Sequence, residues 1–366
     1  MPEAFKNHFN KKLIQTMASS LKRVSKKFDH QLFTQKATKN LQQLELKERS
    51  HHITQALNFS LPDDFKTSGK IILNALEKSK EGDLTSWQIM PLTHYVALYG
   101  QKDFVLSMSL LKEMTKRFTS EFSIRFFIIN QPEKTLKYLE KWTRDKDHHV
   151  RRLVSEGTRP RLPWAMMLPQ FIEDPGPIIL LLEKLKDDES EYVRRSVANN
   201  LNDISKDHPD LIAKIARNWL IKSSPQRKKL IRHACRSLIK LGHKKTLKAL
   251  GYKDPKIKSV SLKITTSKVQ FGSSLEFELT LQSQSKNKQD LIIDFIIHHQ
   301  KANGKTSPKV FKWKNTQLAA SKTLTICKKH PMKKITTRTY YPGKHTIEIV
   351  INGVPQVSKS FELLMS

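Results

Sequence analysis

The sequence predicts two domains, an α-helical solenoid of HEAT-like repeats followed by an immunoglobulin-like β-sandwich. The chain has 366 residues, which is more than one hydrophobic core usually organises. Apolar residues recur at helical spacing up to about residue 250, and beyond residue 255 they alternate with a period of two. A 43-residue repeat lies in the helical part. We therefore predict a helical domain over residues 1–255 and a β-sandwich over residues 256–366.

The helical part is divided into short helices. Leu211, Ile215 and Trp219 form an apolar stripe at helical spacing. Polar residues followed by a proline interrupt such stripes at short intervals, for example at Pro209 and Pro225. Each interruption can end one helix and allow proline to begin the next, so we expect a series of short antiparallel helices.

The repeat joins residues 145–154 (DKDHHVRRLV) to residues 188–197 (DESEYVRRSV), 43 residues further on. This distance lies within the ~40–47 residues typical of paired-helix HEAT-type repeats. In both copies an acidic turn precedes a helix whose two valines face the core and whose arginines point elsewhere. Two interpretations stay open: the arginines form a basic track along the solenoid, or they pair with the acidic residues of the adjoining turn.

The β part shows strand and turn signals. Every second residue is apolar from Leu275 to Leu281 and from Ile347 to Ile351. Asn352-Gly353 is a strong signal for a hairpin turn. Trp313 suits the core of a sandwich, although the paired cysteines of antibody domains are absent.

Charge points to a polyanionic partner. The chain has 66 Lys plus Arg against 34 Asp plus Glu, a formal net charge of +32 and a pI near 10.0. Nucleic acid is the first candidate and an anionic membrane surface the second. The longest aliphatic run, residues 178–182, is far shorter than the roughly 20 residues that span a bilayer. Cys235 and Cys327 fall in different predicted domains, so no disulfide framework is expected.

Motifs for cofactors and metals are missing from the sequence. It contains no Gly-x-Gly-x-x-Gly, no phosphate loop, no CxxC pair and no HExxH. Adjacent histidines occur at His51-His52, His148-His149 and His298-His299. Neighbouring side chains point in different directions, so these pairs are poor metal sites and we interpret them as surface histidines. We expect no cofactor and no metal.

One loop in the helical part is unusual for a repeat. The helix that carries Arg151 and Arg152 stops at Glu156-Gly157, and the chain continues through Arg159, Pro160, Arg161 and Pro163 to Trp164. The prolines restrict the backbone, so the loop can present its side chains with little flexibility. Arginine suits phosphate, and an exposed tryptophan suits a base, a sugar or a cation. Equally, Trp164 can simply pack between two helix pairs.

Three segments carry a family resemblance: residues 155–164 (SEGTRPRLPW), 120–128 (SEFSIRFFI) and 198–205 (ANNLNDIS). In these the chain resembles the AlkC-type DNA alkylation repair glycosylases of bacteria, relatives of the AlkD type. The likeness covers essentially the whole chain, although the β part is similar in architecture more than in motif. It implies monofunctional hydrolysis of the N-glycosidic bond of cationic N-alkylated bases (3-methyladenine, 3-methylcytosine and 1-methyladenine). It also implies recognition of bent duplex DNA without a deep base pocket.

The resemblance carries over four catalytic residues, Glu121, Glu156, Trp164 and Asp203. Carboxylates near the deoxyribose can stabilise the positive charge that builds up as the glycosidic bond breaks, and one can activate water. An aromatic face near the deoxyribose can stabilise the same positive charge by about 0.5–2 kcal/mol. Which carboxylate activates water stays open. The acids can also pair with Arg125, Arg152 or Arg195 and position them.

For DNA phosphates we predict Arg125, Arg152, Arg159, Arg161 and Arg195. The expected partner is duplex DNA with alkylated bases, bound by a monomer in the bacterial cytoplasm at the nucleoid, with no membrane role. The alternative is a non-catalytic HEAT-repeat scaffold that binds nucleic acid, since a fold alone does not imply a reaction.

Overall fold

The computed structural model describes residues 4–79 and 82–365. The chain forms two compact units, Met1–Asp207 and His208–Ser366. Helices precede strands in the chain, as predicted, and the change lies between Ala249 and Ile257. Because the second unit begins at His208, the helices between this residue and Ala249 belong to the same unit as the strands. The domain limits 1–255 and 256–366 stay a prediction.

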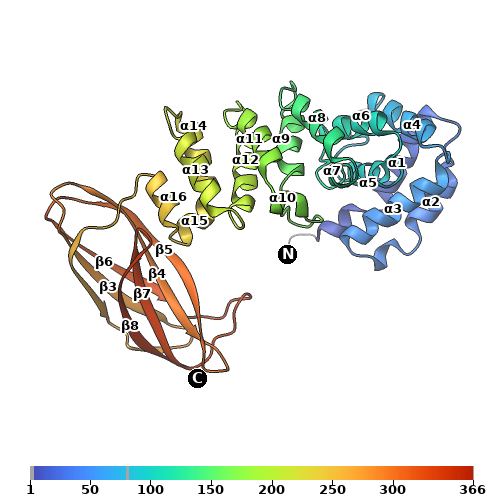
Figure 1. Ribbon diagram of the computed structural model, residues 1–366. Coiled ribbons are helices and arrows are strands. Elements are labelled where there is room, and N and C mark those ends of the chain that lie inside the picture. The colour runs from blue at the N-terminus through green and yellow to red at the C-terminus, as the bar shows by residue number, and fades with distance from the viewer. Residues whose placement is uncertain (1–3, 80–81, 366) are drawn as a thin grey trace. The chain divides into compact units, whose positions relative to one another are not determined.

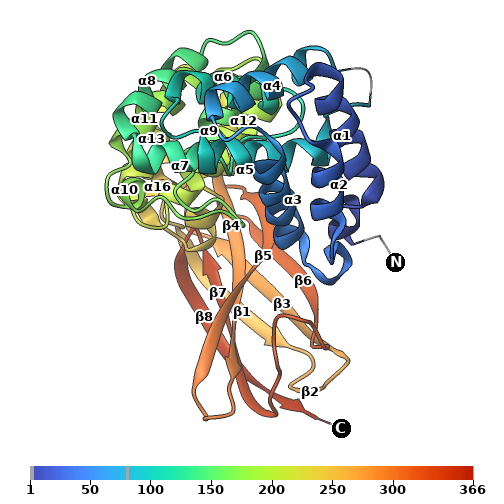
Figure 2. The ribbon, with the colours of Figure 1, turned by 90° about the vertical axis from the view of Figure 1, so that its right-hand side faces the viewer.

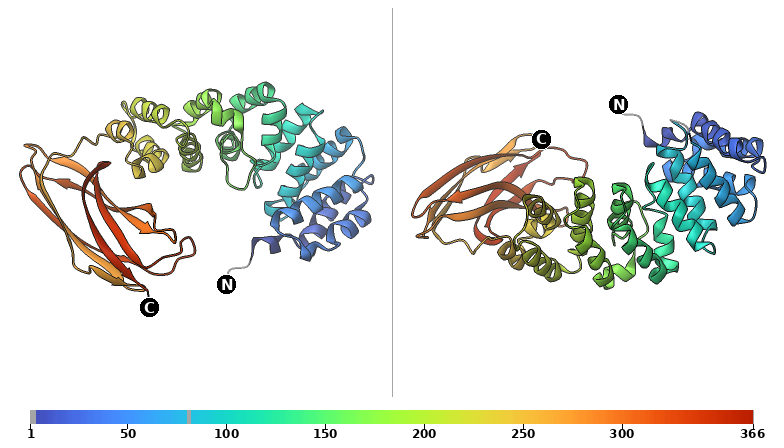
Figure 3. Two further views of the ribbon diagram at one scale, coloured as in Figure 1. Left: turned by 60° about the horizontal axis from the view of Figure 1, so that its bottom comes forward. Right: turned by 90° about the horizontal axis from the view of Figure 1, so that it is seen from above.

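Helices stacked side by side build the first unit, and they follow a curved row (Figures 1, 2 and 3). In chain order they are α1 (Lys11–Val24), α2 (His30–Thr38), α3 (Leu46–Ser60), α4 (Phe65–Glu77), α5 (Ile89–Tyr99), α6 (Phe104–Thr115), α7 (Ile124–Asn130), α8 (Pro132–Trp142), α9 (His148–Gly157), α10 (Pro169–Glu173), α11 (Gly176–Leu185) and α12 (Glu191–Ile204). Short 3-10 helices lie at Phe5–His8, Leu41–Gln43 and Ser86–Gln88.

The two copies of the sequence repeat form α9 and α12. Their valines are buried, which confirms the predicted core face. Arg151 Nη1 donates to the carbonyls of Asp145 and Lys146 before α9. Arg194 Nη1 donates to the carbonyls of Asp188 and Glu189 before α12, so the same contact recurs one repeat later.

Arg151 also joins the two copies. Its guanidinium donates to both carboxylate oxygens of Asp188, at 2.6 and 2.9 Å, and Asp188 lies in the acidic turn of the next copy. For Arg151, pairing with an adjoining acidic turn is therefore the correct interpretation.

The second unit contains four helices and a two-sheet sandwich among its described residues. The helices are α13 (Pro209–Trp219), α14 (Pro225–Ala234), α15 (Arg236–Lys240) and α16 (Lys244–Ala249). The strands are β1 (Ile257–Ile264), β2 (Lys268–Gln270), β3 (Ser274–Ser283), β4 (Gln289–Gln300), β5 (Thr306–Leu318), β6 (Thr323–Pro331), β7 (Gly343–Ile351) and β8 (Val354–Leu364). Prolines at the first turn of α13 and α14 confirm the predicted helix starts.

One sheet has the strand order β1-β3-β6 and the other β2-β8-β7-β4-β5. The strands pair antiparallel except for β2 with β8. Alternating burial along β3 and β7 confirms the predicted period of two. Trp313 packs half-buried against this core, where its ring meets that of Phe277 with centroids 5.0 Å apart.

The predicted turn at Asn352-Gly353 connects β7 and β8 and holds the strands to the helices of this unit. Asn352 Nδ2 donates to the carbonyl of Lys253, 2.8 Å away, just before β1. A Cβ atom on Gly353 would lie 2.5 Å from the carbonyl oxygen of Gly242, between α15 and α16, so only glycine fits there.

The surface location predicted for the histidine pairs is wrong for His299. It is 4% exposed and lies in the sandwich, whereas His298 points outward and contacts Glu348. Adjacent residues of a strand face opposite sides, so one member of such a pair must enter the core.

Both cysteines are free thiols, Cys235 buried and Cys327 exposed. Within residues 4–79 and 82–365, no helix has the length and apolar character that crossing a membrane requires. The same residues contain no cluster of His, Cys, Asp and Glu side chains suited to hold a metal ion.

Candidate active site

Five charged side chains of the first unit form a row of alternating sign, which we call the charged row: Glu121, Arg152, Glu156, Arg159 and Asp203. Arg152 Nη1 donates to Glu121 Oε2, and its other terminal nitrogen lies 3.5 Å from Glu156 Oε1. Arg159 Nη1 donates to the same Glu156 oxygen at 2.7 Å, and its Nε donates to Asp203 Oδ2 at 2.8 Å. The three predicted catalytic carboxylates are thus linked through two arginines.

Local structure positions each member. Glu121 lies in the turn before α7, where Thr119 Oγ1 donates to its Oε2 at 2.9 Å. Glu156 ends α9 beside Gly157, and a Cβ atom on Gly157 would lie only 2.6 Å from Ile124 of α7. The glycine lets the end of α9 pack closely on α7, which brings Glu156 near Glu121.

Glu156 is buried, and its two oxygens have different partners. Ser196 Oγ of α12 donates to Oε2 at 2.6 Å, while Arg159 and Arg152 meet Oε1. Burial opposes the charge of Arg159. The hydrogen bond to Asp203 and the charge of Glu156 outweigh it, and together they raise the pKa of Arg159 above its usual value. The five side chains are therefore held together as a chain of ion pairs.

The loop after α9 presents Trp164 to solvent. Trp164 is 65% exposed, and its φ of 65° lies in the left-handed region, which costs a non-glycine residue roughly 1–2 kcal/mol. Arg125 is fully buried and donates to the carbonyls of Gly157, Arg159 and Met166. It therefore connects the parts of the loop that precede and follow Trp164.

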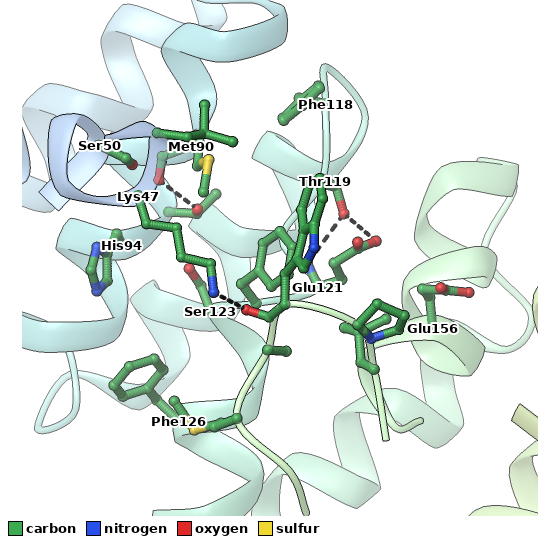
Figure 4. A pocket seen from close by; sticks show the side chains of 18 of the residues that line it. Lys47, Ser50, Met90, His94, Phe118, Thr119, Glu121, Ser123, Phe126 and Glu156 are labelled. Carbon is green, nitrogen blue, oxygen red and sulfur yellow. Dashed lines mark hydrogen bonds between the residues drawn. The ribbon is translucent and has the colours of Figure 1, made fainter. Parts of the chain in front are cut away.

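A cavity of about 540 Å³ lies beside the charged row. Glu121, Glu156, Arg159 and Trp164 line it, together with apolar side chains from α5, α7 and the segments before them, among them Trp87, Met90, Phe118 and Phe126. Figure 4 shows Glu121 and Glu156 on one side of this cavity and Lys47 with His94 on the other. Asp203 is not among its lining residues, but it is bonded to Arg159, which is one of them.

The structure does not support three of the predicted phosphate contacts. Arg125 is buried, with its guanidinium nitrogens bonded to backbone carbonyls. Arg152 and Arg159 are bonded to the acids of the charged row, and Arg159 is 8% exposed. A phosphate would compete with these contacts, so we infer that the main part of the three arginines is to organise the site.

The other two predicted phosphate contacts stay predictions. Arg161 lies nearer to solvent, but its guanidinium already forms two hydrogen bonds with Asp207, at 2.9 and 3.1 Å. The Arg195 side chain is 66% exposed and lies 3.4 Å from Glu191 one turn earlier on α12. Of these two, Arg195 is the more accessible cation.

Sequence reasoning missed three side chains that hold the site, Thr119, Ser196 and Lys47. Ser196 occupies the position at which the first copy of the repeat has the buried Leu153. A hydroxyl at this core position could have indicated that it bonds to a buried polar group. Lys47 of α3 donates to the backbone carbonyl of Trp164, 117 residues further along the chain. No local sequence pattern predicts a contact over such a distance.

The arrangement suits reactions that develop positive charge. Fixed carboxylates in a partly desolvated cavity stabilise a cationic transition state without reorganising. Trp164 adds an aromatic face that attracts cations, next to Glu121 and Glu156. Arg159, the cation on the cavity wall beside these acids, is itself paired with Glu156 and Asp203.

Known proteins resemble this chain over nearly its full length. Residues 258–365 match the family model of the C-terminal Ig-like domain of the uncharacterised protein YhaZ. The uncharacterized protein YhaZ of Bacillus subtilis (strain 168) is 38% identical over 322 residues, which are 88% of each chain. The sequence is also 34% identical to that of the alkylpurine DNA glycosylase AlkC of Pseudomonas fluorescens. The structure of AlkC was solved bound to DNA containing an abasic site analog. That match covers 99% of this chain and 100% of the other, with a TM-score of 0.86.

Proposed function

Because the chain belongs to the AlkC-type family, we propose that it is a monofunctional DNA glycosylase in base excision repair. Its substrates are cationic N-alkylated bases in duplex DNA: 3-methyladenine, 3-methylcytosine and 1-methyladenine. One observation carries the proposal: Glu121, Glu156 and the exposed Trp164 line one cavity.

The chemistry of such a substrate fits this cavity. Alkylation makes the base a cation, so it leaves with the electron pair of the C1′–N bond and needs little help from an acid. Positive charge then develops on the deoxyribose, and the carboxylates stabilise it. Water adds at C1′ and loses a proton, which leaves an abasic site and a free neutral base.

We assign the activation of water to Glu121. Its Oε2 is bonded to Thr119 and Arg152, whereas Oε1 accepts no hydrogen bond from the residues the structure describes. Both oxygens of Glu156 are engaged. Glu156 therefore acts as a fixed negative charge, and Glu121 has an oxygen ready to orient and deprotonate a water molecule.

The test is release of methylated bases from a methylated duplex, resolved by chromatography. We expect the protein to release 3-methyladenine and 3-methylcytosine, and Glu121→Gln to slow release by about 10²-fold or more. Glu133→Gln on α8, a surface change outside the cavity, is the matched control and should leave the rate unaltered. DNA binding without any release would overturn the proposal and favour the non-catalytic scaffold.

The proposal extends to the setting of the reaction. We place the protein on duplex DNA as a monomer in the bacterial cytoplasm, at the nucleoid. The net charge of +32 supports a polyanionic partner.

A further inference from the structure

We propose that Lys47 and Arg125 are positioning residues that fix the Trp164 indole at the cavity from two sides. This inference rests on the proposed function, because it assigns to both residues a part in glycosidic bond cleavage. Neither residue belongs to the charged row.

Arg125 holds the two ends of the loop together. Its Nη1 donates to the carbonyls of Gly157 and Arg159, at 2.9 and 2.8 Å, where the chain leaves α9. Its Nε and Nη2 donate to the carbonyl of Met166, at 2.9 and 2.5 Å, where the chain has passed Trp164. One guanidinium therefore sets the separation of the two loop ends.

Arg125 keeps this function across the physiological pH range. Burial and the charge of Arg159 lower its pKa to about 10, so the guanidinium remains protonated near neutral pH. All of its donors are then available to the three carbonyls.

Lys47 holds the loop at Trp164 itself. The ammonium group donates to the carbonyl oxygen of Trp164, as the dashed line from Lys47 shows in Figure 4. Lys47 comes from α3, so the bond joins the loop to the opposite wall of the cavity.

Trp164 needs such contacts because its backbone conformation is unfavourable. Its φ of 65° is rare for a residue with a side chain, and such strain persists only where neighbouring contacts hold it. The loop's own bonds, from Leu168 N to the Pro160 carbonyl and from Ala165 N to the Leu162 carbonyl, leave the Trp164 carbonyl to Lys47. Loss of Lys47 should let the peptide turn and the indole move.

The same type of arginine occurs elsewhere in this unit and provides a control. Arg49 of α3 is also buried, and it donates to the carbonyls of Leu44, Lys6, Phe9 and Gln42. Arg49 does not touch the Trp164 loop. Substitutions at Arg49 therefore measure the loss of stability when a buried arginine loses its carbonyl partners, without any effect on the position of Trp164.

The test uses the full chain and begins with Lys47, which is exposed and can be replaced with little risk to folding. Lys47→Met should lower the single-turnover release of 3-methyladenine about tenfold, with the Kd for DNA within about twofold, because it misplaces a cavity group. Lys47→Arg should restore most of the rate. Lys70→Met, an exposed lysine of α4, is the matched control and should behave like the parent protein.

A second measurement follows Trp164 directly. In protein labelled with 5-fluorotryptophan, the ¹⁹F resonance of Trp164 is assigned through Trp164→Phe. Lys47→Met and Arg125→Lys should shift or broaden that resonance, and Lys70→Met and Arg49→Lys should not. Arg125→Lys should also slow release by more than Arg49→Lys does at an equal loss of melting temperature.

The outcomes separate this inference from the proposed function. An unmoved Trp164 resonance in Lys47→Met and Arg125→Lys overturns the positioning proposal, whatever the activity. If the parent protein releases no base, the proposed function fails, and with it the catalytic part of the inference. A moved resonance together with an unchanged release rate also overturns that catalytic part.

Discussion

His299 and His330 illustrate what single residues decide in the β-sandwich. Both are buried, and burial lowers the pKa of His299 to about 3 and that of His330 to about 4, with the positive charge of Arg338 adding to the effect. Neither ring nitrogen of His299 has a hydrogen-bond partner among the described residues. Each ring is therefore neutral in the fold, and protonation favours the unfolded chain.

We expect the second unit to lose stability as pH falls from 7 to 5. An unfolded histidine has a pKa near 6.5, so in this range the unfolded chain binds more protons than the folded one, and the free energy of unfolding falls with pH. The loss is about 2 kcal/mol for each fully buried histidine at pH 5. Asp294 acts in the opposite direction, because burial raises its pKa to about 6, but it offsets only part of the loss.

Urea unfolding followed by circular dichroism at pH 7 and pH 5 measures this effect. His299→Phe keeps an aromatic ring against Tyr340 and removes the titration, so its stability should depend less steeply on pH. An identical pH dependence in the parent protein and the variant would contradict the assignment.

At the residue scale the sequence indicated the acids of the site better than the arginines. Glu121, Glu156 and Asp203 were marked by motifs, and the structure links them in one row. Arg125 and Arg159 were predicted to contact DNA phosphates. Burial depends on which carbonyls and carboxylates fold against a side chain, and these partners come from distant segments.

The contact of α9 with α12 shows how the helical elements are fixed to one another. The Arg151 side chain is 9% exposed and that of Asp188 is 5% exposed, and the carboxylate also accepts from the Ser190 backbone at 2.9 Å. The pair links one repeat to the turn that begins the next. It therefore sets the register of the two helices that carry Glu156 and Ser196.

Asp188→Asn should lower the free energy of unfolding by about 3 kcal/mol, because it removes the buried partner of Arg151 and leaves only the exposed Glu189 carboxylate to balance its charge. Glu140→Gln removes one partner of the exposed Lys184–Glu140 pair between α11 and α8, and should cost less than about 1 kcal/mol. Urea denaturation of both variants gives the comparison. Equal losses would show that the Arg151–Asp188 pair is not a structural link.

At the element scale, periodicity predicted most of what formed. The alternation in β3 and β7 and the 43-residue repeat both depend on local spacing, which survives in the fold. The parallel pairing of β2 with β8 and the distribution of the strands between the two sheets were not predictable, because strand order depends on contacts between distant segments.

For the whole molecule the net charge was the most informative number and the least specific one. It predicted a polyanionic partner, yet it could not say which cations face that partner. The sequence also did not show that α13 to α16 form one compact unit with the sandwich. The period of the apolar residues changes after residue 250 because helices give way to strands there, and this change carries no information about which segments contact each other.

The buried arginines bear on the salt dependence of the DNA binding that we propose. Because Arg125, Arg152 and Arg159 are bonded inside the first unit, we expect them to release few counterions in that binding. Only exposed cations contribute to the salt dependence, by about 0.9 in the slope of log K against log salt for each phosphate neutralised.

If Arg195 contacts a phosphate, Arg195→Ala should reduce that slope by about 0.9. Lys184→Ala removes the same charge from α11, which contributes no residue to the charged row or the cavity, so its slope should stay close to that of the parent protein. Fluorescence anisotropy with a labelled duplex at four or more salt concentrations measures the slopes. A slope in Arg195→Ala equal to that of Lys184→Ala would remove Arg195 from the DNA contacts and leave phosphate binding to other exposed cations of this basic chain.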